Sequence, residues 1–210
     1  MPKTAPFDEY PDRYDAWYDE HRAACRSELD ALRALLPESG EGLDIGVGTG
    51  RLAALLGLDF GVDPSPEMRR RAHRRGITVR DGVAEALPYR EDRFDEALMT
   101  TTLCYLDDPP RAFREAHRVL RPGGTLVVGF IDRDHPLGQR YARSDSPFYE
   151  NVSFHTVPEV LDLLDTAGFE SLTTRQTLFT DAPGALDRPD PVTEGYGNGG
   201  FVAVRGRTPE

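Results

Sequence analysis

A glycine-rich turn between a predicted strand and a predicted helix contains the residues best suited to hold a ligand. The segment 43–51 reads LDIGVGTGR, so Asp44 stands two residues before the first of three glycines, Gly46, Gly48 and Gly50. Glycine has no Cβ and lets a ligand approach the backbone closely. The start of the following helix offers free N–H groups and a partial positive charge. In an open α/β sheet such a turn lies at the carboxyl ends of the strands, where ligands bind.

The spacing of the glycines and of two acids indicates which ligand fits. A dinucleotide fingerprint requires G-x-G-x-x-G, but the position of its third glycine is occupied by Arg51. Asp63 closes the next predicted strand, where a carboxylate can accept two hydrogen bonds from ribose hydroxyls. Asp44 favours a ligand with an ammonium group over a diphosphate. These residues predict a ligand with a ribose, a cationic group and no pyrophosphate. S-adenosylmethionine (SAM) meets all three conditions, whereas a nicotinamide-dependent oxidoreductase is disfavoured.

Strands and helices alternate along the chain in the order that positions such a turn. Short apolar runs predict strands at 43–45, 58–62, 77–80, 94–100 and 125–131, followed by two more at 171–179 and 200–205. Helices are expected over the first ~38 residues and at 52–56, 66–76, 110–120 and 157–167. Alternation with short connections is typical of βαβ units, and the last two strands, with no helix between them, must pair antiparallel. The predicted fold class is α/β: a doubly wound, mostly parallel seven-stranded sheet with an antiparallel last strand and helices on both faces.

The composition excludes several classes of protein. The chain has 210 residues and a net charge of −11, which opposes binding to nucleic acid or to an anionic membrane. The arginine-rich run 69–75 is therefore interpreted as a solvated helix face. Two cysteines without a CxxC pattern, and apolar stretches no longer than a strand, favour a cytoplasmic protein. The five histidines show no metal-ligand spacing, so no metal is expected.

Segments in a fixed order resemble the class I (Rossmann-like) SAM-dependent methyltransferases that act on small molecules. They are LDIGVGTGR, FGVDPS, GVAEALP, FDEALMTTTLCYLDDP and HRVLRPGGTLVVGF, which together cover roughly residues 40–132, and HTVPEVLDLLDTAGF extends the likeness. The resemblance implies SAM as the cofactor and a single domain over 1–210. Within it, 1–38 would form a helical lid, 40–132 the SAM-binding core and 133–210 the substrate-side half.

The resemblance also implies roles for individual residues. Asp44 and the backbone of Gly46 would contact the methionyl ammonium and carboxylate, and Gly48 and Gly50 would shape the turn. The remaining cofactor contacts would be Asp63 at the ribose, Pro64 beside the adenine, the Val83–Ala84 backbone at the adenine edge and Thr100 beside the methionyl part. Many relatives carry an acid at the position of Val83, so the adenine amine would lose one hydrogen bond here, for which Asp81 could compensate.

Two residues are candidates for catalysis. Tyr105 follows the fourth strand, a place that faces the reacting methyl in the family. His155 precedes a predicted helix, and an imidazole titrates near neutral pH. Either residue could equally be structural. The aromatic residues Tyr10, Tyr14, Trp17 and Tyr18 could stabilise a sulfonium through cation–π attraction or simply dock the N-terminal helix.

The expected function is transfer of a methyl group from SAM to a small-molecule acceptor. The alternative is a non-catalytic SAM-binding regulatory or partner module, which the departure at Val83 and the lack of an evident base leave open. The acceptor site is expected in the segments 1–20, 132–156 and 181–199, because loops build such sites on this fold.

Overall fold

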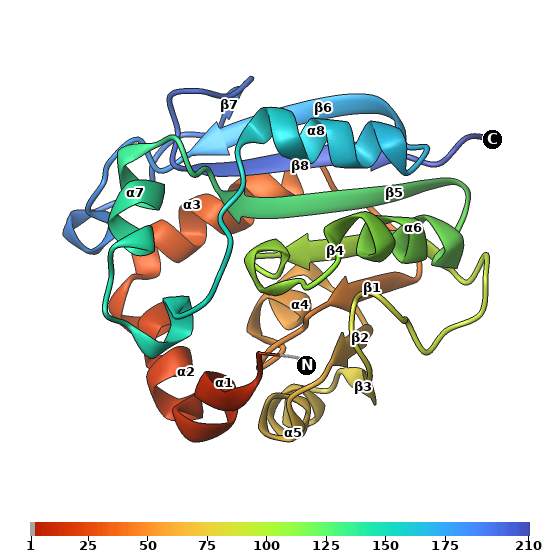
Figure 1. Ribbon diagram of the computed structural model, residues 1–210, viewed down its shortest axis with the longest axis horizontal. Coiled ribbons are helices and arrows are strands. Elements are labelled where there is room, and N and C mark those ends of the chain that lie inside the picture. Colours follow the sequence, from red (N-terminus) through yellow and green to blue (C-terminus); the bar gives the residue numbers. More distant parts are fainter. Residues whose placement is uncertain (1–2) are drawn as a thin grey trace.

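The computed structural model describes residues 3–210 and contains one mixed β-sheet with helices on both faces (Figure 1). Its strands are β1 (Gly42–Ile45), β2 (Phe60–Asp63), β3 (Thr78–Asp81), β4 (Phe94–Thr100), β5 (Leu120–Ile131), β6 (Glu170–Thr177), β7 (Thr193–Glu194) and β8 (Phe201–Arg207). They lie in the order β3-β2-β1-β4-β5-β8-β6-β7. Pairing among the first five is parallel, and β8 is antiparallel to both β5 and β6.

The doubly wound, mostly parallel architecture is confirmed, with eight strands instead of seven. The additional strand, β7, has two residues and pairs antiparallel with β6 through Arg175–Glu194 and Gln176–Thr193. A two-residue strand is too short to show an apolar pattern, and β7 is therefore not predictable from its own residues. β5 also begins earlier than expected, at Leu120, and its pairing with β4 is irregular near Phe94.

The helices differ from expectation mainly at the N-terminus. They are α1 (Ala5–Glu9), α2 (Pro11–Glu20), α3 (Arg22–Arg33), α4 (Arg51–Leu56), α5 (Pro66–Arg74), α6 (Pro109–Val119), α7 (Pro136–Ala142) and α8 (Val157–Thr166). The single helix expected over the first ~38 residues was wrong, because the chain bends at Tyr10 and His21. A residue before proline is disfavoured in helical geometry, and Tyr10 precedes Pro11. The helix α7 was not expected.

Two apolar cores fix the sheet between its helices. On one face, α6 packs on β5 and buries Phe113, while α8 packs on β6 and β8 and buries Val160 and Leu164. On the other face, α3, α4 and α5 pack against the sheet, where Leu32 lies with Leu98 of β4. In Figure 1, α6 and α8 lie in front of the sheet, and α3 and α4 lie behind it. The carboxyl ends of β1, β2 and β4 therefore meet at one edge, beneath α1 and α2.

Candidate active site

Two neighbouring cavities lie at this edge of the sheet. The small cavity, about 350 Å³, is lined by the glycine turn and by the residues that follow β2, β3 and β4. The large cavity, about 970 Å³, lies between the N-terminal helices and the segment 130–155. Tyr14, Thr101 and Tyr105 line both cavities. These three residues therefore form the junction at which a group bound in one cavity can reach a molecule bound in the other.

The glycine turn adopts a conformation that only glycine accommodates. Gly46 has φ of +78°, and a Cβ added there would collide with the side chain of Thr102. Gly50 has φ of +77°, and its Cβ would lie 2.9 Å from the Cα of Ala72 in α5. Positive φ is costly for other L-residues, so the turn combines left-handed backbone with close approach. It leaves the backbone of Gly46 and Gly48 at the wall of the small cavity.

Asp63 is fixed at the carboxyl end of β2 by two backbone hydrogen bonds. Its Oδ2 accepts the N–H of Gly48 at 2.9 Å, and its Oδ1 accepts the N–H of Ser65 at 2.8 Å. Burial raises the pKa of this carboxyl from 3.8 to about 6, although the two hydrogen bonds oppose the change. The carboxylate lines the small cavity, and each oxygen retains a lone pair for a further donor.

Asp44 lies in β1, two residues before Gly46. Its side chain is 3% exposed, and burial together with the charge of Asp63 raises its pKa to about 7. Within residues 3–210 its carboxyl makes no hydrogen bond, and it is absent from the walls of both cavities. Of the predicted cofactor residues, Asp44 and Gly50 are thus the two that the structure leaves outside the small cavity.

Pro64, Val83 and Ala84, for which the resemblance implies contacts with adenine, line another end of the small cavity. Asp81 cannot replace the acid missing at Val83, because its side chain is 74% exposed and pairs with Arg69 at 2.8 Å. This end of the cavity therefore offers apolar surface and backbone groups.

Thr100 and Thr101 carry two further signs of a binding site. The Oγ1 of Thr100 is buried and has no hydrogen-bond partner among residues 3–210, yet Thr100 lines the small cavity. An unsatisfied buried hydroxyl costs about 1–3 kcal/mol, which a ligand can recover. Thr101 has φ of +53°, unusual for a β-branched residue, and is held there by a 2.7 Å hydrogen bond from its N–H to the carbonyl of Gly129. Such strain concentrates at functional sites.

The two catalytic candidates differ in their ability to accept a proton. The Tyr105 hydroxyl donates to the carbonyl of Phe148 at 2.9 Å, and burial raises its pKa well above the ordinary value, so it keeps its proton. His155 lines the large cavity, and burial lowers the pKa of its imidazole. Its buried Nε2 has no partner within the described chain, while Nδ1 lies 3.7 Å from Oε2 of Glu159. Of the two candidates, His155 is thus the one with an atom, Nε2, that is free to accept a proton.

The aromatic residues of α2 cover the junction. Tyr14, Trp17 and Tyr18 line the large cavity, and Tyr14 also reaches the small one. The Tyr14 and Tyr18 hydroxyls lie 3.1 Å apart. Tyr10 is 39% exposed and stays outside.

Salt bridges attach α2 to the glycine turn and to α5. Arg71 pairs with Asp12 at 2.6 Å, and Arg75 pairs with Asp15 at 2.7 Å. Thr49 of the turn donates to Asp15 at 2.8 Å. The arginine run of α5, interpreted from sequence as a solvated face, therefore pairs in part with the acids of α2 and holds this helix over the cavities.

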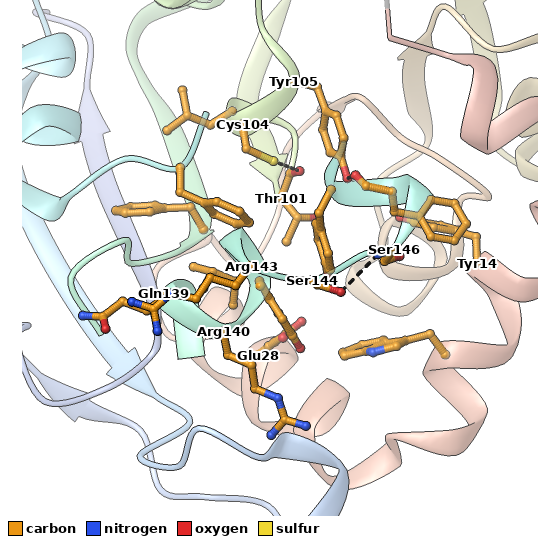
Figure 2. A pocket seen from close by; sticks show the side chains of 18 of the residues that line it. Tyr14, Glu28, Thr101, Cys104, Tyr105, Gln139, Arg140, Arg143, Ser144 and Ser146 are labelled. Atoms are coloured by element: carbon orange, nitrogen blue, oxygen red, sulfur yellow. Dashed lines mark hydrogen bonds between the residues drawn. The ribbon is translucent and has the colours of Figure 1, made fainter. Parts of the chain in front are cut away.

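One site residue that the sequence interpretation missed is Glu28 of α3. It lines the large cavity, where Figure 2 labels it together with Tyr14, Thr101 and Tyr105. Its side chain is 5% exposed. The signal was present in the sequence, because Glu28 precedes Leu32 and Leu35 by four and seven residues and thus lies on the apolar face of the helix.

The fold, the glycine turn and the acid that ends β2 define a nucleoside-binding site of the methyltransferase class. A family model described as a methyltransferase domain matches residues 43–128. The solved structure of a Thermotoga maritima protein, described as a SAM-dependent methyltransferase and possible histamine N-methyltransferase, is 45% identical with a TM-score of 0.94, and the match covers 98% of this chain and 99% of that one.

Two further relatives match most of the chain. A Methanocaldococcus jannaschii protein, MJ1123, is 41% identical over 94% of this chain and 96% of its own length. A SAM-dependent methyltransferase from Mesorhizobium loti is 27% identical with a TM-score of 0.65, covering 86% of this chain and 97% of its own. The chain belongs to the class I SAM-dependent methyltransferase family. It is an enzyme that uses SAM as its methyl donor. This assignment favours the catalytic interpretation over the alternative of a non-catalytic SAM-binding module. Among residues 3–210, no helix combines the length and apolarity needed to span a bilayer.

Proposed function

We propose that this enzyme methylates a small-molecule acceptor held in the large cavity. The observation that carries the proposal is the junction of the two cavities at Tyr14, Thr101 and Tyr105. Volumes of about 350 and 970 Å³ are those of small-molecule sites. The helices α1 and α2 cover the junction, which supports their role as a lid, with 40–132 as the cofactor core and 133–210 as the substrate side.

The small cavity would hold the cofactor. SAM, when bound, supplies an electrophilic methyl group on a sulfonium. Asp63 would accept hydrogen bonds from the ribose hydroxyls with its remaining lone pairs. The backbone of Gly46 and Gly48 would meet the methionyl part, near the unsatisfied hydroxyl of Thr100. Asp44 would act on the methionyl ammonium through its charge, since it is buried and lines neither cavity.

The adenine would lie at the other end of the small cavity, between Pro64 and the Val83–Ala84 backbone. Gly50 would shape the turn without touching the ligand. Without an acid at position 83, the adenine amine has one charge-assisted partner fewer, a loss of about 1.5–3 kcal/mol at most.

The residues at the junction would align the acceptor and exclude water. Methyl transfer needs the acceptor atom in line with the bond that breaks, and positioning of this kind lowers barriers strongly. The ring of Tyr14 would face the cationic centre and stabilise it. Tyr105, whose hydroxyl is committed to Phe148, would form a wall. His155 would accept a proton from the acceptor through its free Nε2.

A cytoplasmic location without nucleic-acid or membrane partners is part of the proposal. It is supported by the net charge of −11 and by Cys25 and Cys104, both free thiols.

The test is conversion of SAM to S-adenosylhomocysteine with a panel of acceptors. The panel contains low-mass amines, phenols, thiols and carboxylates, with histamine included because of the Thermotoga relative, and protein and transfer RNA as macromolecular acceptors. We expect turnover with at least one low-mass class. Turnover only with protein or RNA would contradict the proposal.

A further inference from the structure

We infer that Glu28 recognises a positively charged nitrogen of the methyl acceptor, so that the large cavity selects amines with an apolar body. The inference rests on the proposed function, since it concerns the acceptor site of the same reaction. It assigns substrate selection to a residue of α3, outside the segments that the sequence indicated.

The first observation is a buried carboxyl without a partner. Among residues 3–210, Glu28 makes no hydrogen bond and no ion pair, although its side chain is 5% exposed. It nevertheless reaches the wall of the large cavity (Figure 2). Buried charges in proteins are normally paired or hydrogen-bonded. The missing partner is therefore expected to come from the molecule that fills the cavity.

The second observation is that no cationic side chain pairs with Glu28 among residues 3–210. Three arginines line the same cavity and keep their charge, but none forms an ion pair with Glu28. Arg140 donates to the carbonyl of Asp181 at 3.1 Å, Arg13 lies 5.9 Å from the ring of Phe148, and Arg143 is exposed. A cation in the cavity would thus find in Glu28 a carboxyl that can ionise and pair with it, whereas an anion would gain no ion pair from Glu28.

The remaining titratable groups that face Glu28 are neutral at physiological pH. Burial raises the pKa values of Tyr18, Tyr141 and Tyr149 above their ordinary value, and that of the Cys25 thiol to about 11. These protonated side chains carry no charge, and they attract a cation only through their dipoles and ring faces. Glu28 is therefore the buried group in this part of the cavity that can carry a full charge.

The third observation is the aromatic surface around this carboxyl. Tyr141 and Tyr149 stack with centroids 4.8 Å apart, and Trp17 and Tyr18 lie across the cavity on α2. Aromatic faces attract cations, most strongly where water is excluded, and they also bury apolar groups. A carboxylate beside several ring faces is the arrangement that binds an ammonium group attached to an apolar body.

The test uses Trp17 as the reporter. It is the only tryptophan of the chain and lines the large cavity, so its fluorescence responds to a ligand there. Phenethylamine, 2-phenylethanol and phenylacetate are titrated in the presence of saturating S-adenosylhomocysteine. These probes share an aromatic body and differ in charge. We expect phenethylamine to bind at least ten-fold more tightly than 2-phenylethanol, and phenylacetate to bind most weakly.

Glu28→Gln keeps the size of the side chain and removes its charge. It should reduce the preference for phenethylamine over 2-phenylethanol at least ten-fold while leaving the dissociation constant of S-adenosylhomocysteine within two-fold. Glu28→Asp, which keeps the charge, should retain the preference in part and serves if the glutamine variant does not fold. Glu38→Gln, at an exposed position beyond α3, is the matched control and should change nothing.

Equal binding of the amine and the alcohol to the wild type, tighter binding of phenylacetate, or an unchanged preference in Glu28→Gln would overturn the inference. The outcome is separable from that of the proposed function. Amine selectivity lost in Glu28→Gln, without any turnover on low-mass acceptors, would refute the proposed function and leave the cation site standing.

Discussion

Replacing Glu28 by glutamine should stabilise the free protein, and increasingly so as the pH rises. Burial raises the pKa of Glu28 from 4.5 to about 8, so the folded state holds this proton more tightly than the unfolded chain. For an acid with a raised pKa, stability is present at low pH and is lost as the pH rises from about 4.5 to about 8. The 3.5 pH units between these values are equivalent, at about 1.4 kcal/mol each, to an upper limit of about 5 kcal/mol.

The measured effect should be smaller than this limit. The Glu28 carboxyl reaches a cavity, and water that enters it solvates the charge. We therefore expect Glu28→Gln to raise the free energy of unfolding by about 1–3 kcal/mol more at pH 8 than at pH 5, within the range typical of buried ionisable groups. A buried acid that destabilises the free protein in this way is expected where the acid serves a function, because functional sites often reduce stability.

The assay is urea denaturation without SAM at pH 5, 6.5 and 8, with Glu38→Gln as the exposed control. Because the other buried acids titrate in both proteins, the difference between variant and wild type isolates Glu28. A variant that is less stable than the wild type at every pH, or a difference that does not change with pH, would refute the reasoning.

Three further predictions follow from the site. Gly46→Ala and Gly57→Ala place a Cβ on backbone of almost equal φ, +78° and +79°, but only the Cβ at position 46 collides with a neighbour. Gly57→Ala should therefore lower the free energy of unfolding in urea by about 1 kcal/mol, and Gly46→Ala should lower it by more. Gly46→Ala should also reduce SAM affinity, measured by calorimetry, at least about ten-fold. Asp63→Ala should weaken SAM binding by about 10–100-fold in the same assay, while Asp81→Ala, which removes an exposed carboxylate, should not. His155→Gln should lower kcat with little change in SAM affinity, and the acidic limb of the wild-type pH–rate profile should lie below 6.5, because burial lowers the pKa of His155.

Most of the fold and of the candidate cofactor site is predictable from the sequence, because both depend on patterns among neighbouring residues. The short apolar runs of a parallel sheet and the glycines of the turn are readable from neighbouring residues. Seven of the eight strands were predicted. The two-residue β7 was missed because its formation depends on a partner strand and not on its own side chains.

The large cavity is harder to predict from the sequence, because residues far apart in the chain form its walls. Tyr14, Thr101 and Tyr149 meet there from three parts of the chain. The bend at Tyr10 could have been read from Pro11, and it is this bend that sets α1 and α2 over the cavities. The strain at Thr101 had no sequence signal, since threonine rarely adopts positive φ. Glu28 is an acid on the apolar face of α3, and its spacing from Leu32 and Leu35 is the sequence signal for its burial.

A crystal structure with bound S-adenosylhomocysteine tests the central claim most directly. The ribose hydroxyls should lie within hydrogen-bond distance of the Asp63 carboxylate, and the sulfur should point toward the junction of the cavities beside Tyr14 and Thr101. A ligand bound elsewhere, or one whose sulfur faces away from the large cavity, would contradict the account.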